Sequence, residues 1–131
     1  MKLTERDVTL SSIEPADIVL FVREEPPAVA LVVSVDQGRA LITRGKRDKV
    51  SLTGHLRSEV ALVHPDDLAS CGLRAPTRFD LAEAFWTSTN ALRRVGRFPT
   101  DNKVRMRELR AAIEQARGEK THTRRRAFYG V

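Results

Sequence analysis

The sequence contains a single cysteine, Cys71, among 131 residues, and aromatic residues make up only 5% of it. A lone cysteine excludes a disulfide within the chain and a zinc site built from several cysteines. The fold must therefore depend on an apolar core, for which a chain of this length suffices. Cys71 lies between Leu68 and Leu73 and beside Gly72, which predicts a buried packing residue; the alternative is a nucleophilic thiol.

Long apolar runs are also missing. The longest, at 28–35, is far shorter than the roughly 20 residues that a membrane-spanning helix needs. The opening MKLTERDVTL is too charged for a secretory signal. We expect a soluble, cytoplasmic protein with no membrane partner.

Motifs that hold metals or cofactors are absent from the sequence. His55, His64 and His122 lack the spacing of metal ligands, and there is no glycine-rich phosphate loop and no obvious catalytic triad. His64 directly precedes a proline, which favours a helix-entry residue over a catalytic base. We expect no metal and no cofactor, so that function must come from charge and architecture.

Positive charge is abundant and clustered, with a formal net charge of +6. Six basic residues lie from Arg39 to Arg57 against one acid, and nine lie from Asp101 to Val131 against four acids. This clustering favours a nucleic acid as partner; the alternative is charge that serves solubility alone. The candidate nucleic-acid contacts are Arg23, Arg39, Lys46, Arg47, Lys49, Arg107, Arg110, Arg124, Arg125 and Arg126.

The first half of the chain is typical of short strands. Runs rich in Val, Ile and Phe, separated by proline and glycine turns, predict strands over 17–23, 28–35, 39–43, 49–52 and 58–64. No gap between them can hold a crossover helix, which disfavours a parallel sheet. We predict an α+β, mainly β protein: a small SH3-like antiparallel barrel followed by C-terminal helices.

The second half shows helical signals. They predict helices over 64–71, over 81–95 with Asp80 as cap and Gly96 as stop, and over 101–117 with Thr100 or Asp101 as cap and Gly118 as stop. The intervening segment 77–81 is expected to bury Phe79 and Leu81 and to point Arg78 and Asp80 outward. On the last helix, an apolar and a cationic face are predicted by the spacing of Met106, Leu109, Ile113 and Ala116 and of Lys103, Arg107, Arg110 and Arg117.

We expect one domain over 1–118 and a basic tail over 119–131. The tail, with its three consecutive arginines, Phe128 and Tyr129, is interpreted as an arm for nucleic acid or a docking peptide, with a frayed terminus as the alternative. Phe85 and Trp86 are candidates for stacking on a base, and core packing is the alternative.

The order of these segments resembles the PemK/MazF-like toxin family. The resemblance rests on DIVLF at 17–21, AVALVVSVD at 28–36, ALIT at 40–43, SCGLRAPTRFDL at 70–81 and RRVGRF at 93–98, and it covers roughly 16–116. The resemblance implies an SH3-like barrel, usually dimeric, that cleaves single-stranded RNA. It also implies RNA rather than DNA as the nucleic acid, an antitoxin or other protein partner, and a homodimer.

The resemblance further implies a catalytic site with an arginine, in an Arg-Pro pair before the second strand, and a Thr or Ser after the third. Thr43 takes the second place. At the first place the chain has Pro26 and Pro27 without an arginine, so Arg44 or Arg47 is expected to supply the positive charge that cleavage of a phosphodiester needs. His55 is the candidate general acid, with a polar turn residue as the alternative.

These observations leave three functions open. The first is an endoribonuclease, with Thr43, Arg44 and His55 as catalytic residues. The second is a nucleic-acid-binding module derived from that family without cleavage. The third is an interaction protein, encoded by a phage or other mobile element, whose basic tail docks on a protein.

Overall fold

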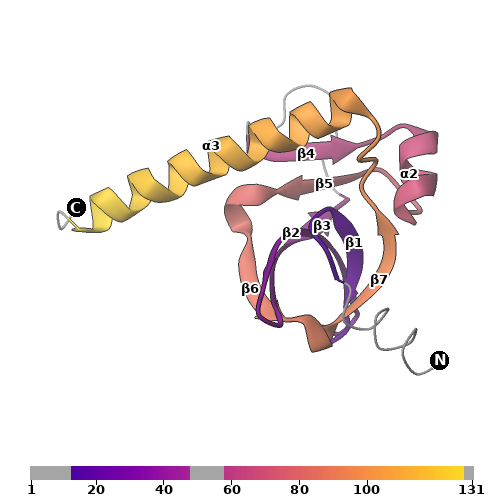
Figure 1. Ribbon diagram of the computed structural model, residues 1–131, viewed down its shortest axis with the longest axis horizontal. Helices are drawn as coiled ribbons and strands as arrows, with labels where there is room; N and C mark the ends of the chain where they lie inside the picture. The colour runs from indigo at the N-terminus through magenta and orange to yellow at the C-terminus, as the bar shows by residue number, and fades with distance from the viewer. Residues whose placement is uncertain (1–12, 48–57, 129–131) are drawn as a thin grey trace.

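Antiparallel strands form most of the protein, and they curl into an open barrel (Figure 1). The computed structural model describes residues 13–47 and 58–128, and side chains as far as residue 118. The strands are β1 (Asp17–Phe21), β2 (Ala28–Asp36), β3 (Arg39–Lys46), β4 (Glu59–Leu62), β5 (Thr77–Asp80), β6 (Phe85–Ser88) and β7 (Leu92–Arg97). The helices are α2 (Pro65–Cys71) and α3 (Lys103–Phe128), with single 3₁₀ turns η1 (Leu81–Glu83) and η2 (Thr89–Ala91).

The seven strands make one sheet in the order β4-β5-β3-β2-β1-β7, with β6 paired to β3. The first part of β3 pairs with β6 and its last two residues pair with β5, so β3 holds the two halves of the sheet together. β2 and β3 are joined at Gln37 and Gly38, which both have positive φ. This is the backbone that a two-residue hairpin turn requires. The expected mainly β barrel is confirmed.

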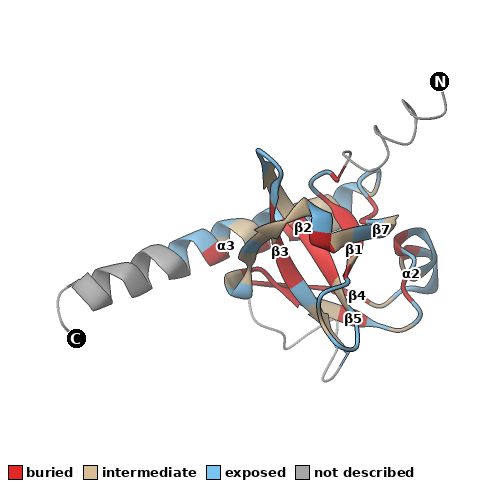
Figure 2. Cartoon of the chain, turned by 90° about the horizontal axis from the view of Figure 1, so that it is seen from below, coloured by how far each residue is buried: buried red, intermediate tan, exposed pale blue. Residues whose placement is uncertain are grey.

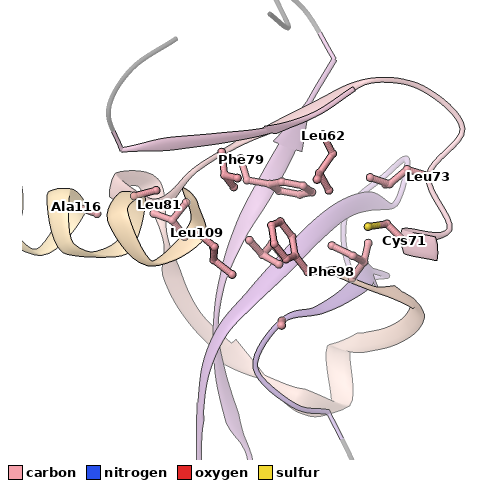
Figure 3. Packing of buried hydrophobic residues seen from close by; sticks show 13 residues of the cluster. Leu62, Cys71, Leu73, Phe79, Leu81, Phe98, Leu109 and Ala116 are labelled. Atoms are coloured by element: carbon pink, nitrogen blue, oxygen red, sulfur yellow. The ribbon is translucent and has the colours of Figure 1, made fainter. Parts of the chain in front are cut away.

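Two apolar clusters lie on opposite faces of the central strands. Successive residues of a strand point to opposite faces, and accordingly Leu31 of β2 belongs to one cluster and Ala30 to the other. The first cluster packs between the sheet, α2 and α3, where Phe79, Phe98 and Leu109 meet (Figure 3). The strands carry most of the buried residues, whereas α2 and the described part of α3 carry mainly exposed and intermediate ones (Figure 2).

Several predicted elements agree with the structure. The strands at 17–23, 28–35, 39–43 and 58–64 and the helix at 64–71 are confirmed, each with slightly different ends. His64 precedes Pro65, the first residue of α2, as expected of a helix-entry residue. The predicted strand at 49–52 lies outside the described residues.

The prediction of a helix over 81–95 is wrong. This stretch folds as η1, β6, η2 and the start of β7. Asp80 and Ser88 accept hydrogen bonds from the backbone amides of Ala82 and Asn90, as helix caps do, but each caps only a single 3₁₀ turn. Hydroxyl and β-branched side chains between the caps favour extended backbone, and pairing with β3 stabilises it.

The predicted boundaries of the last helix are also wrong. Asn102, rather than Thr100 or Asp101, caps α3: its Oδ1 accepts from the amides of Val104 at 3.0 Å and Arg105 at 3.2 Å. α3 then continues through Gly118 to Phe128. A glycine costs a helix only about 1 kcal/mol relative to alanine, so it ends a helix only when a turn follows. The helix thus enters the predicted tail, and the division at residue 118 stays a prediction.

Candidate nucleic-acid interface

Arg44 presents its guanidinium beside two aromatic rings. Its Cζ lies 4.5 Å from the ring centroid of Phe85 and 5.9 Å from that of Phe21, and the two ring centroids are 5.9 Å apart. Arg44 faces this way because it pairs across the sheet with Ala30, whose side chain belongs to the cluster that contains Phe21. An arginine over aromatic faces is restrained in position yet keeps its charge. Its side chain is 48% exposed, so the charge is accessible from solvent.

Glu24 forms an ion pair with Arg44. It lies in the β1–β2 connection, residues 22–27, which contains Pro26 and Pro27. A partly exposed pair of this kind contributes only about 0–1 kcal/mol. A phosphate that approaches Arg44 can therefore compete with Glu24 at little cost. The ion pair also neutralises the charge of Glu24, which would otherwise repel a polyanion.

Thr43 points to the opposite face of β3 from Arg44. It is 1% exposed, and its Oγ1 donates a hydrogen bond of 2.6 Å to the backbone carbonyl of Asp80. The structure therefore does not bring Thr43 and Arg44 together on one surface. The hydroxyl joins β3 to the end of β5, which is a structural contact, and the catalytic role of Thr43 stays a prediction.

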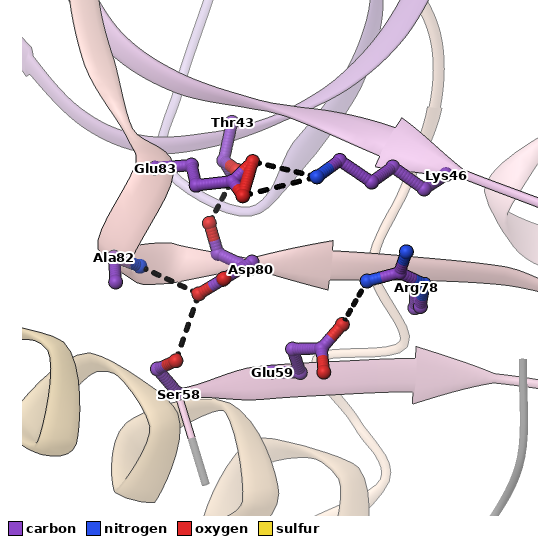
Figure 4. A network of polar contacts seen from close by, with 8 residues as sticks. All are labelled: Thr43, Lys46, Ser58, Glu59, Arg78, Asp80, Ala82 and Glu83. Atoms are coloured by element: carbon purple, nitrogen blue, oxygen red, sulfur yellow. Dashed lines mark hydrogen bonds and ion pairs between the residues drawn. The ribbon is translucent and has the colours of Figure 1, made fainter. Parts of the chain in front are cut away.

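Asp80 is the centre of a polar network around Thr43 (Figure 4). Its carboxylate accepts from the Ser58 hydroxyl at 2.8 Å and from the Ala82 amide at 3.0 Å. Asp80 is buried, so the prediction that it points outward is wrong, because capping η1 turns the carboxylate back toward the protein. Phe79 and Leu81 are buried as expected. In the same network, Arg78 pairs with the buried Glu59.

The other predicted cations do not converge on one point. Arg23, in the β1–β2 connection, and Arg47, directly after β3, are exposed. Lys46 pairs with Glu83 at 2.7 Å, and Arg39 lies over the ring of Trp86, 5.9 Å from its centroid. Two more, Arg107 and Arg110, are exposed on α3.

Five candidates cannot be placed. His55 and Lys49 lie outside the described residues. Arg124, Arg125 and Arg126 belong to the last part of α3, beyond the described side chains. Their proposed roles as a general acid and as nucleic-acid contacts stay predictions.

Sequence analysis assigned no role to Glu24 and so missed its ion pair with Arg44. Glu24 and Arg44 are 20 residues apart and meet through the pairing of β2 with β3. The available signal was the acid-rich Glu24-Glu25-Pro26-Pro27 loop before a strand that pairs with a basic one. It also missed that Phe85 and Trp86 are on opposite faces of β6, next to Ile42 and Leu41 respectively.

Cys71 is fully buried in the first apolar cluster, which confirms its packing role. Burial raises the pKa of its thiol to about 11.

Within residues 13–47 and 58–118, no three His, Cys, Asp or Glu side chains are grouped as a metal site would need. In the same part of the chain, no helix has the length and apolar character to cross a membrane.

Comparison with known proteins gives a likeness in fold. No protein-family model matches the sequence, and no curated protein does. Among solved structures, the chain is similar to an endoribonuclease in complex with its cognate antitoxin from a mycobacterial species, with 13% identity over 81% of this chain and 95% of that chain and a TM-score of 0.61. It is also similar to the Mycobacterium tuberculosis toxin MazF-mt6 (16% identity, 76% of this chain and 94% of that chain covered, TM-score 0.57) and to a chain of the MazE–MazF structure from Deinococcus radiodurans (14% identity, 81% and 95% covered, TM-score 0.56). The expected PemK/MazF-like fold is therefore confirmed.

Proposed function

We propose that this protein is a MazF-like toxin that acts on single-stranded RNA, which it holds on the barrel face around Arg44. The likeness of the fold to an endoribonuclease and to MazF toxins supports this class of function. The net charge of +6 supports a polyanionic substrate. The single observation that carries the proposal is the position of the Arg44 guanidinium, between two aromatic rings and a carboxylate on an accessible surface.

These groups fit the chemistry of RNA cleavage. The 2′-hydroxyl of RNA attacks the adjacent phosphorus, the bond to the 5′-oxygen breaks, and the products are a 2′,3′-cyclic phosphate and a 5′-hydroxyl. A base must take the proton of the attacking hydroxyl, and a cation must stabilise the charge that develops on the phosphate. In the proposed mechanism Arg44 is the cation and Glu24, its ion-pair partner, is the base. His55 is proposed to protonate the leaving oxygen.

The aromatic rings beside Arg44 supply a second kind of contact. Unpaired bases stack on aromatic faces, and each such stack contributes about 1–3 kcal/mol with little dependence on sequence. Phe85 is half-buried and Phe21 is buried, so Phe85 is the ring that a base can reach. A nucleotide whose base contacts Phe85 would leave its phosphate near Arg44. Arg23 and Arg47 are proposed to hold neighbouring phosphates.

Labelled single-stranded RNA and DNA of the same sequence test this function. We expect the purified protein to cleave RNA and not DNA, because only RNA carries the attacking hydroxyl. Arg44→Ala should slow cleavage by about a hundredfold to a thousandfold, as loss of a group that stabilises a developing charge does. Glu24→Gln should slow cleavage while RNA binding stays as strong or becomes stronger.

Arg74→Ala is the matched control, because it removes an equal, exposed charge from the connection between α2 and β5, and Arg74 is not among the candidate nucleic-acid contacts. It should leave cleavage unchanged apart from a small electrostatic effect. Equal rates for Arg44→Ala and Arg74→Ala would refute the assignment of Arg44. Failure of the unmodified protein to bind RNA would refute the proposed function altogether.

A second candidate is RNA binding without cleavage. The burial of Thr43 favours it, since the hydroxyl that the family resemblance assigns to the chemistry is engaged with the Asp80 carbonyl. In that case RNA is bound intact, and the affinity falls steeply as salt rises because phosphate contacts release counterions. Intact RNA after prolonged incubation with a protein that binds it would select this candidate.

We also propose an antitoxin as protein partner and a cytoplasmic site of action. Two of the similar structures are complexes of a toxin with its antitoxin, which supports a partner of this kind. A homodimer is proposed from the family resemblance. Light scattering of the free protein, with the expected result of twice the chain mass, checks it.

A further inference from the structure

An exposed ion pair between Lys46 and Glu83 lies on the same side of β3 as Arg44. The Nζ of Lys46 is 2.7 Å from Oε1 and 3.0 Å from Oε2 of Glu83 (Figure 4). Lys46 follows Arg44 by two residues, with Gly45 between them. A Cβ at Gly45 would lie 3.0 Å from a ring carbon of Phe79, so Gly45 faces the first apolar cluster. Lys46 and Arg44 face the other way, because successive residues of a strand alternate between its two sides.

The same ion pair is close in the chain to Phe85, the ring that a base is proposed to reach. Glu83 precedes Phe85 by two residues. Phe85 is the cross-strand neighbour of Ile42, which projects from the same side of β3 as Arg44. Residues two apart on a strand are separated by about 7 Å, which is comparable with the size of a nucleobase. A base that contacts Phe85 can therefore turn one of its edges toward Lys46 and Glu83.

Both members of the pair keep the capacity to bind a ligand. The exposed fraction of the side chain is 39% for Lys46 and 51% for Glu83, so each is accessible from solvent. An ammonium has three N–H donors and each carboxylate oxygen has two lone pairs, so the ion pair uses only part of this capacity. Together the two side chains present two acceptor oxygens beside a donor. A ligand can contact both without breaking the ion pair.

Guanine is the base whose edge complements this arrangement. Its Watson–Crick edge carries two adjacent donors, N2–H and N1–H, followed by the acceptor O6, and in single-stranded RNA this edge is free to be read. Adenine and cytosine have one amino donor beside an unprotonated ring nitrogen, and uracil has one N–H between two carbonyls. In each of these bases an acceptor would face the carboxylate and be repelled by it. A carboxylate that accepts two parallel N–H bonds gives strong and directional recognition.

From these observations we infer that the pair of Lys46 and Glu83 selects guanosine at the position where RNA contacts Phe85. The carboxylate of Glu83 accepts from N1–H and N2–H of the base, and the ammonium of Lys46 donates to O6. Glu83 is thus a specificity-determining residue that reads the base, whereas Arg44 contacts the phosphate. The inference rests on the proposed function, since it assigns a base preference to the RNA that this surface is proposed to hold.

Inosine tests this contact without a change in the protein, because it differs from guanosine only in lacking the 2-amino group. The probes are short fluorescein-labelled uridine oligonucleotides with guanosine, inosine or uridine at one central position. A 2′-O-methyl group on every ribose removes the attacking hydroxyl, so the probes stay intact. In fluorescence anisotropy, the guanosine probe should bind about tenfold more tightly than the inosine probe, as loss of one hydrogen bond to a charged group predicts. The uridine probe should bind no more tightly than the inosine probe.

Variants of the protein locate the contact. Glu83→Gln should reduce the preference for guanosine over inosine to less than about twofold, because the amide group sets its own donor against the donors of guanine. Glu114→Gln is the matched control: Glu114 is also an exposed carboxylate paired with a basic side chain, that of Arg117 on α3, and its loss changes the net charge equally. This variant should keep the preference. Lys46→Met should weaken binding of the guanosine and inosine probes alike, because both bases carry O6.

The outcomes separate this inference from the proposed function. Equal binding of the guanosine and inosine probes by the unmodified protein would overturn the inference and leave RNA binding established. A preference that survives Glu83→Gln would overturn the assignment of Glu83. Equal weakening of all three probes by Glu83→Gln would show that the ion pair serves only to join β3 to η1. No binding of any probe would refute the proposed function, and this inference with it.

Discussion

The carboxylate of Asp17 lies 2.8 Å from the guanidinium of Arg94, across the paired strands β1 and β7. Asp17 is fully buried, and it also accepts from Arg97 at 2.9 Å and from the backbone amide of Glu14 at 2.8 Å. Two arginines of the basic segment at 93–97 therefore stabilise the barrel. The basic residues thus differ in their partners: Arg94 and Arg97 pair with a fully buried carboxylate, whereas Arg44 pairs with Glu24, which is partly exposed.

This pairing predicts an asymmetric effect of mutation. Arg94 and Arg97 are partly exposed and regain water when Asp17 is replaced, whereas Asp17 cannot regain water when the arginines are replaced. The double substitution of Arg94 and Arg97 by alanine should cost about 3–5 kcal/mol, the range for a buried charge left without its partner. Asp17→Asn should cost less. Urea denaturation measures both, and an equal or greater loss for Asp17→Asn would contradict the assignment.

Gly96 and Cys71 predict a second effect on stability. A Cβ at Gly96 would lie 2.0 Å from the carbonyl oxygen of Cys71, and backbone on both sides prevents relief by a side-chain rotation. Gly96→Ala should therefore destabilise the protein by about 1–3 kcal/mol or more, as overpacking does. Gly118→Ala is the control, because it lies in α3 with open space around it and should stabilise by about 1 kcal/mol. Thermal denaturation should give a lower melting temperature for Gly96→Ala, and a higher one for Gly118→Ala, than for the unmodified protein.

The hydroxyl of Thr43 provides a test of its structural role. Thr43→Val removes the buried hydrogen bond that the Thr43 hydroxyl donates to the Asp80 carbonyl, at a cost of about 1 kcal/mol. Thr43→Ser keeps the hydroxyl and should lose much less. Chemical denaturation compares the two variants. A valine variant as stable as the unmodified protein would show that the contact contributes nothing.

The thiol of Cys71 should be unreactive in the folded protein. Burial raises its pKa to about 11, so at pH 8 only about one thiol in a thousand is ionised, and the side chain is out of contact with solvent. Iodoacetamide should label Cys71 far more slowly in buffer than in denaturant. The rate at which the folded state is labelled should rise with pH only as the pH approaches the raised pKa, because only the ionised thiol reacts. Rapid labelling at neutral pH without unfolding would show that Cys71 is accessible.

The helices at the end of the chain show where prediction from sequence failed. The segment at 81–95 has caps and a glycine in suitable places, yet its residues pair with β3 and β1, which lie far away in sequence. The secondary-structure propensities of these residues depend on neighbours in sequence and contain no information about pairing with distant strands. Gly96, interpreted as a helix stop, is required because the end of α2 approaches β7 too closely for a side chain.

What the sequence determined by itself was the class of the fold. Apolar runs of strand length, broken by prolines and by turns such as Gln37-Gly38, are local signals, and they were sufficient for a mainly β barrel with an amphipathic last helix. Tertiary structure alone decided which polar residues act together. Strand alternation put Thr43 inside and Arg44 outside, and the pairing of strands distant in sequence brought Glu24 to Arg44, because a site forms from contacts in space that no local pattern encodes.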